Sequence, residues 1–89
     1  MKINKAIQEF VDSAIASGYV SKEDRYYLLN RVLYLVGEES FESSKEVEQP
    51  SLLDAMANLV ESAVESGKIE NDSEERDWLE QELMNLVIP

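Results

Sequence analysis

Two stretches of the chain carry apolar residues at steps of three and four, the spacing that places them on one face of an α-helix. Each stretch ends at a glycine, Gly18 in the first and Gly67 in the second. Because glycine readily adopts the left-handed conformation that follows the last turn of many helices, both helices are predicted to end there. The two apolar stripes consist of Ile3, Ala6, Ile7, Phe10, Val11, Ala14 and Ile15, and of Leu52, Met56, Leu59, Val60, Ala63 and Val64.

A further helix is predicted after each glycine. The first covers residues 22–36, with Ser21 as its cap and Gly37 as its stop. The second is capped by Asp72 or Ser73, and its stripe consists of Leu79, Leu83, Leu86 and Val87. The pattern therefore predicts an all-α protein with four helices.

The two halves of the chain repeat one another. The segment Ala6–Val20 returns as Ala55–Ile69, and after a slightly longer turn Arg25 matches Arg76. Identical residues in the first segment pair are Ala6/Ala55, Val11/Val60, Ser13/Ser62, Ala14/Ala63, Ser17/Ser66 and Gly18/Gly67. Self-similarity of this length indicates duplication of one structural unit. We therefore expect the four helices to form two repeated helical hairpins.

The expected organisation is a single helical module over residues 1–89. Its parts are a hairpin at 2–37, an acidic linker at 38–50 and a hairpin at 51–88. The linker is rich in glutamate and has no helical period, so it is predicted to be solvated. Its apolar residues Phe41 and Val47 are expected to fasten it to the core.

Charge and composition exclude several classes of function. Lysine and arginine number 8 against 19 aspartates and glutamates, a formal net charge of −11. Nucleic acid and anionic membranes would be repelled over a Debye length of about 8–10 Å, whereas a basic partner would be attracted. With no histidine and no cysteine, the commonest metal ligands and general base are missing, and we expect no catalytic residue, cofactor or metal site. No signal-peptide pattern is present, so the expected location is the cytoplasm.

Two motifs near the start of the last helix partly match known sites, a calcium loop and a phosphopantetheine attachment site. Residues 71–82 space their acids somewhat like a calcium loop, but Arg76 stands where the sharp turn requires glycine. Ser73 invites comparison with the phosphopantetheine serine of acyl carrier proteins, which are also small and acidic. In those proteins a leucine follows the serine, whereas here Glu74 follows it. A capped, charged helix start is the simpler interpretation.

The helix predicted at 22–36 has apolar residues round most of its circumference. One interpretation is a central helix buried by the others; the alternative is a docking surface for another domain or subunit. Once the stripe of Leu28, Val32, Leu35 and Val36 is used for the core, Leu33 is left over together with Tyr27 and Tyr34, beside Arg31. Tyrosine and arginine are enriched at interfaces, so Tyr27, Arg31 and Tyr34 are the predicted docking surface.

The chain resembles the start of those bacterial galactose-1-phosphate uridylyltransferases that carry a helical N-terminal region. The resemblance covers the whole chain, including the ending LMNLVIP. It is most specific in the acidic, aromatic and Asn-Arg positions of the second predicted helix, namely Glu23, Asp24, Arg25, Tyr27, Asn30, Arg31 and Leu33.

This resemblance implies a piece of a longer nucleotidyltransferase of galactose metabolism, with Pro89 just before the catalytic part. Members of the family transfer a uridylyl group from UDP-glucose to a hexose 1-phosphate through a histidine that lies downstream of this segment. Since the chain has no histidine, none of the catalytic residues can be carried over, and the implied role is a noncatalytic N-terminal domain. Its expected partners are the catalytic domain of the same chain or a second copy. The alternative is a free-standing acidic interaction module that binds a basic partner or mimics nucleic acid.

Overall fold

A computed structural model of the chain describes residues 3–43 and 49–88. Within these residues the chain forms four α-helices and one short 3-10 turn, and it contains no strand. The elements are α1 (Ile3–Ala16), η1 (Lys22–Asp24), α2 (Arg25–Val36), α3 (Leu52–Glu65) and α4 (Ser73–Val87). The predicted all-α class with four helices is therefore confirmed.

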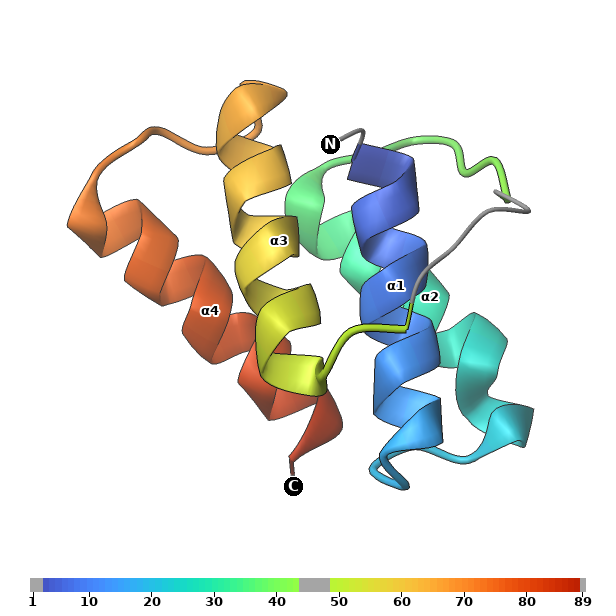
Figure 1. The fold of residues 1–89 in the computed structure, drawn as a ribbon. Coiled ribbons are helices and arrows are strands. Elements are labelled where there is room, and N and C mark those ends of the chain that lie inside the picture. Colours follow the sequence, from blue (N-terminus) through green and yellow to red (C-terminus); the bar gives the residue numbers. More distant parts are fainter. Residues whose placement is uncertain (1–2, 44–48, 89) are drawn as a thin grey trace.

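The first and third helices form the centre of the molecule. They lie side by side and run in opposite directions, as Figure 1 shows, and they make the most extensive contact between any two elements. On the outer sides of this pair, α2 packs against α1 and α4 packs against α3. A smaller contact between α2 and α4 completes the bundle.

The core is built from the apolar stripes that the sequence predicted. Phe10 of α1 and Leu59 of α3 are both fully buried. Burying a side chain of this size contributes about 1.5–3 kcal/mol, so the two stripes supply much of the stability of the bundle. Small residues occupy the remaining buried places on the central pair and let α1 and α3 approach closely; they are Ala6, Ser13, Ala14, Ala55, Ser62 and Ala63.

Both helices of the central pair end at the predicted glycines. Gly18 has φ +82° and Gly67 has φ +72°, in the left-handed region. The residue after each glycine then donates its N–H to a carbonyl of the last helical turn: Tyr19 N to Ala14 O at 3.1 Å, and Lys68 N to Ala63 O at 2.8 Å. These bonds satisfy carbonyl groups that the helix itself leaves unpaired.

Substituting Gly67 by alanine is expected to lower the free energy of unfolding by about 1–2 kcal/mol, the cost of a left-handed conformation for an L-residue with a side chain. Space is not the cause, because a Cβ at this position would meet no atom within 4 Å. Gly67→Asn is the matched control and should cost less, since asparagine tolerates this conformation. Urea unfolding followed by circular dichroism measures both. Equal losses for the two variants would contradict the conformational explanation.

One ion pair joins α1 to α2, and another joins α3 to α4. Arg25 pairs with Asp12 in the first half, and Arg76 pairs with Glu61 in the second. These positions correspond to one another in the sequence repeat. All four side chains are partly in contact with solvent, so the two ion pairs contribute little to the stability of the bundle. Their main effect is to orient the paired helices.

The start of the second helix differs from the sequence prediction. A helix over 22–36 capped by Ser21 was expected, but residues 22–24 form a 3-10 turn and α2 begins at Arg25. The Ser21 hydroxyl donates to Asp24 Oδ2 at 3.0 Å and makes no capping bond to the backbone. The Asp24 N–H, the group that the cap would bind, donates instead to the Ser21 carbonyl oxygen at 3.1 Å, so the predicted cap is wrong.

Side chains cap the later helices as predicted. Ser51 Oγ accepts the N–H of Asp54 at 3.2 Å at the start of α3. At the start of α4, Asp72 Oδ1 accepts the N–H of Glu75 at 2.8 Å. Asp72, and not Ser73, is therefore the cap, and Ser73 is the first residue of the helix.

Of the predicted linker, residues 38–43 and 49–50 are described, and they form neither helix nor strand. Phe41 is half-buried and packs against the core, as expected. Val47, the other residue predicted to fasten the linker, lies outside the described residues. The hydroxyl of Ser13 donates to Pro50 O at 2.9 Å, which fixes the end of the linker against α1.

Candidate docking surface

The outer side of α2 exposes large aromatic side chains. Tyr27 is 67% exposed and Tyr34 is 85% exposed, and Tyr26 is exposed as well. The interpretation of α2 as a central, fully buried helix is therefore wrong. The centre of the bundle is the α1–α3 pair, and α2 covers only one side of it.

Tyr27, Arg31 and Tyr34 lie on one face of α2. Their spacing of four and then three residues places them one above another along the helix. Arg31 is exposed and forms no ion pair with another described residue. The structure thus presents two exposed tyrosine rings and an exposed guanidinium on a single outward face, which we call the α2 face.

The opposite side of α2 fixes the orientation of this face. The buried residues of the helix are Leu28, Leu29, Val32 and Val36. Leu35, predicted to belong to the core, and Leu33, predicted to be left over, are both half-buried and pack against the core. Leu29 was not assigned to the core stripe from the sequence. Its burial shows that the apolar side of α2 is wider than one stripe, because α2 contacts α4 in addition to α1.

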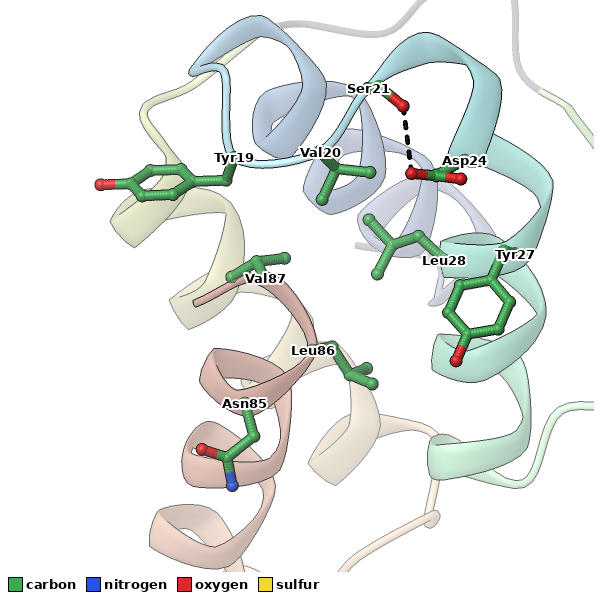
Figure 2. Close-up of a pocket in the computed structure, with 9 residues that line it drawn as sticks. All are labelled: Tyr19, Val20, Ser21, Asp24, Tyr27, Leu28, Asn85, Leu86 and Val87. Carbon is green, nitrogen blue, oxygen red and sulfur yellow. Dashed lines mark hydrogen bonds between the residues drawn. The ribbon is translucent and has the colours of Figure 1, made fainter. Parts of the chain in front are cut away.

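A hollow of about 470 Å³ adjoins the α2 face. It lies between the η1 turn, the first turn of α2 and the last turn of α4, as Figure 2 shows. We call it the α2–α4 hollow; its lining residues are Tyr19, Val20, Ser21, Asp24, Tyr27, Leu28, Asn85, Leu86 and Val87. Tyr27 belongs to both the hollow and the α2 face, so the two form one continuous surface.

No pattern in the sequence predicts this hollow. Its walls include residues of α2 and α4, which lie far apart in the chain. The periodicity of apolar residues in each helix does not show that the two helices contact one another. Asp24 and Tyr27 were noticed only as part of the resemblance and of the tyrosine pair.

The described residues offer little for metal chemistry. No group of three or more aspartates, glutamates, histidines or cysteines lies close enough among residues 3–43 and 49–88 to hold a metal ion. The stretch weighed as a calcium loop is instead the start of α4, in which Arg76 forms its ion pair with Glu61. None of the helices in the described part of the chain has both the length and the hydropathy needed to cross a lipid bilayer.

Comparison with known proteins gives one consistent result. The chain is 39% identical over 83 residues to galactose-1-phosphate uridylyltransferase 1 of Streptococcus pneumoniae serotype 4, which covers 93% of the chain and 16% of that protein. It is 40% identical over 85 residues to the galactose-1-phosphate uridylyltransferase of Lactiplantibacillus plantarum, covering 94% of the chain and 17% of that protein. The enzyme of the same name from Streptococcus mutans is 36% identical over 83 residues.

The resemblance to galactose-1-phosphate uridylyltransferases is confirmed. The similarity spans nearly the whole of this chain, but the chain spans only 16% of the length of the Streptococcus pneumoniae relative. No family model matches the chain, and no solved structure matches it. What the similarity supports is correspondence to one part of a galactose-1-phosphate uridylyltransferase.

Proposed function

We propose that this chain is the noncatalytic N-terminal domain of a galactose-1-phosphate uridylyltransferase. The observation that carries the proposal is the coverage: the similarity spans 93% of this chain and only 16% of the Streptococcus pneumoniae relative. A segment of that size leaves most of a longer protein to supply the active site. The parent enzyme would transfer a uridylyl group from UDP-glucose to galactose 1-phosphate.

The side chains available support a noncatalytic role. Uridylyl transfer needs a nucleophile and positive charge around the phosphates. The chain has no histidine, and its formal net charge of −11 would repel both nucleotide sugar and sugar phosphate. Most of the aspartates and glutamates among the described residues are exposed or partly exposed; Glu9, on α1, is buried.

The α2 face is the proposed contact with the catalytic part of the same polypeptide. Tyrosine buries a large area while its hydroxyl keeps a polar partner, and arginine offers five donors, so Tyr27, Arg31 and Tyr34 have the composition of an interface centre. Their exposure in this chain means that none of them is needed for its own core. In the chain on its own, the same face would be available to a second copy.

The module of residues 1–89 is proposed to consist of two repeated hairpins, at 2–37 and 51–88, joined through 38–50. Three features of the described residues support this. The helices α1 and α3 have equal lengths of 14 residues, both end at a left-handed glycine, and both carry the acidic partner of an interhelical ion pair.

The purified chain is expected to show no uridylyl transfer. Incubation with UDP-glucose and galactose 1-phosphate, followed by chromatography of the nucleotide sugars, should yield no UDP-galactose. The named Streptococcus pneumoniae relative serves as the positive control in the same assay. Turnover by the chain, at a rate that stays constant through successive purification steps, would contradict the noncatalytic role.

A free-standing acidic interaction module is the second candidate, favoured by the net charge of −11 and by the exposed Arg31 between two exposed tyrosines. The genomic reading frame separates the two proposals. Continuation past codon 89 into several hundred residues that include histidine supports the domain of an enzyme. A stop at that codon supports the module.

A further inference from the structure

The C-terminal ends of the two outer helices, α2 and α4, differ in their contacts with cationic side chains. A helix leaves its last carbonyl groups without partners in its own backbone and carries partial negative charge there, which cations stabilise. Neither α2 nor α4 has a basic residue in its last turn. Any cation at these ends must therefore come from elsewhere.

At the end of α2, that cation is Lys68. Its ammonium group donates to Gly37 O at 3.3 Å and pairs with Glu38 Oε1 at 2.9 Å. Lys68 comes directly after Gly67, in the connection between α3 and α4. The turn of the second hairpin thus supplies a lysine to the end of the second helix.

At the end of α4, the corresponding position holds no cation. Tyr19 follows Gly18 as Lys68 follows Gly67, and it lines the α2–α4 hollow together with Asn85 and Val87. Tyr19 is 52% exposed, and its ring is directed outward in Figure 2. Among the described residues, no lysine or arginine bonds to the last turn of α4.

The hollow beside that end combines an apolar floor with a negative rim. Val20, Leu28 and Leu86 surround the space in Figure 2, and the Asp24 carboxylate lies at its edge. In the described part of the chain, Asp24 accepts a hydrogen bond from Ser21 but has no cationic partner. Lysine and arginine side chains have this same division, with an apolar stem and a charged head.

We propose that the α2–α4 hollow receives a lysine or arginine side chain from a basic segment of a partner protein. The stem lies against the apolar floor, and the cationic head lies between Asp24 and the carbonyl end of α4, as Lys68 does at the end of α2. The net charge of −11 attracts such a segment from a distance. The inference does not depend on the proposed function.

The test compares two peptides of nearly the same shape, one with the charged guanidinium of arginine and one with the neutral ureido group of citrulline. Acetyl-Leu-Arg-Leu-amide and its citrulline counterpart are titrated into the ¹⁵N-labelled chain at low salt, and the amide signals are followed by NMR. The arginine peptide should move the signals of Val20, Leu28 and Val87. The citrulline peptide should bind about tenfold more weakly, because charge-assisted hydrogen bonds are worth roughly that factor more.

Two variants locate the site, each with a matched control. Asp24→Asn should weaken binding of the arginine peptide about tenfold. Asp77→Asn makes the same change of charge near the start of α4, on its exposed side, and should alter the affinity less than about twofold. Tyr19→Lys should fill the hollow from within and abolish peptide binding, whereas Tyr26→Lys, which adds the same charge away from the hollow, should not.

Each other outcome overturns the proposal. Equal binding of both peptides would mean that the hollow recognises apolar groups only. Equal weakening by the two aspartate variants would mean that attraction is general to the surface. Signals of the hollow that shift with protein concentration alone would identify a second copy as the occupant, and no shift with either peptide would show that the hollow binds neither.

Discussion

Replacing Leu59 by alanine is expected to lower the free energy of unfolding by about 2–5 kcal/mol, the range for removing a buried leucine side chain. Leu59 is fully buried on α3, at the contact with α1 that forms the centre of the bundle. The cost has two parts, the lost transfer of the side chain out of water and the cavity left behind. Since stability in a domain of this size is small, such a loss would unfold a large fraction of the molecules.

Urea unfolding at constant pH, followed by circular dichroism, measures this loss. Leu53→Ala is the matched control, because Leu53 lies on the same helix but is 71% exposed, and its loss should stay within about 0.5 kcal/mol. Phe10→Ala tests the same contact from α1 and should cost about 3–5 kcal/mol. A loss below about 1 kcal/mol for Leu59→Ala would show that α1 and α3 do not pack as described.

Replacing Tyr27 and Tyr34 by serine is expected to weaken the proposed contact between this module and the catalytic part. Each tyrosine that acts as a hot spot contributes about 2 kcal/mol, so the loss of both should lower the affinity about a thousandfold. The physical reason is the loss of two rings from the α2 face. The measurement is calorimetric titration of the chain into the parent polypeptide from which residues 1–89 have been removed. Sedimentation of the chain alone reports any self-association through the same face.

Tyr26→Ser is the control for this experiment. Tyr26 is 75% exposed on the same helix, but its position is rotated about 100° from Tyr27, off the α2 face. It should leave the affinity nearly unchanged. Circular dichroism should show unaltered helicity for every variant, because all three tyrosines are exposed. An undiminished affinity of the double variant, or its unfolding, would contradict docking through the α2 face.

Local signals in the sequence predicted the ends of helices accurately where no tertiary contact is involved. The end of α1 follows from Gly18, whose left-handed conformation needs no tertiary contact. The caps at Ser51 and Asp72 likewise depend on a side chain and a backbone N–H three residues later. The cap at Ser21 failed because residues 22–24 form a 3-10 turn, in which the Asp24 N–H donates to the Ser21 carbonyl oxygen and not to its hydroxyl.

The surface of α2 was predicted only in part. Periodicity separated Tyr27 and Tyr34 from the core stripe, and both are exposed. Leu29 was left out of the predicted core stripe, because the buried width of a helix depends on how many neighbours it has. That number became known only when α2 was seen to contact both α1 and α4.

By itself, the sequence determined the helical class, the two glycine stops, the correspondence of the two halves, the acidic charge and the resemblance to galactose-1-phosphate uridylyltransferases. All of these depend on residue types at short spacing or on direct comparison of residues. Only the tertiary structure decided that α1 and α3 form the centre, that Lys68 reaches the end of α2, and that the α2–α4 hollow lies beside the end of α4. Such contacts depend on how packed helices bring distant residues together, and no local spacing encodes that distance.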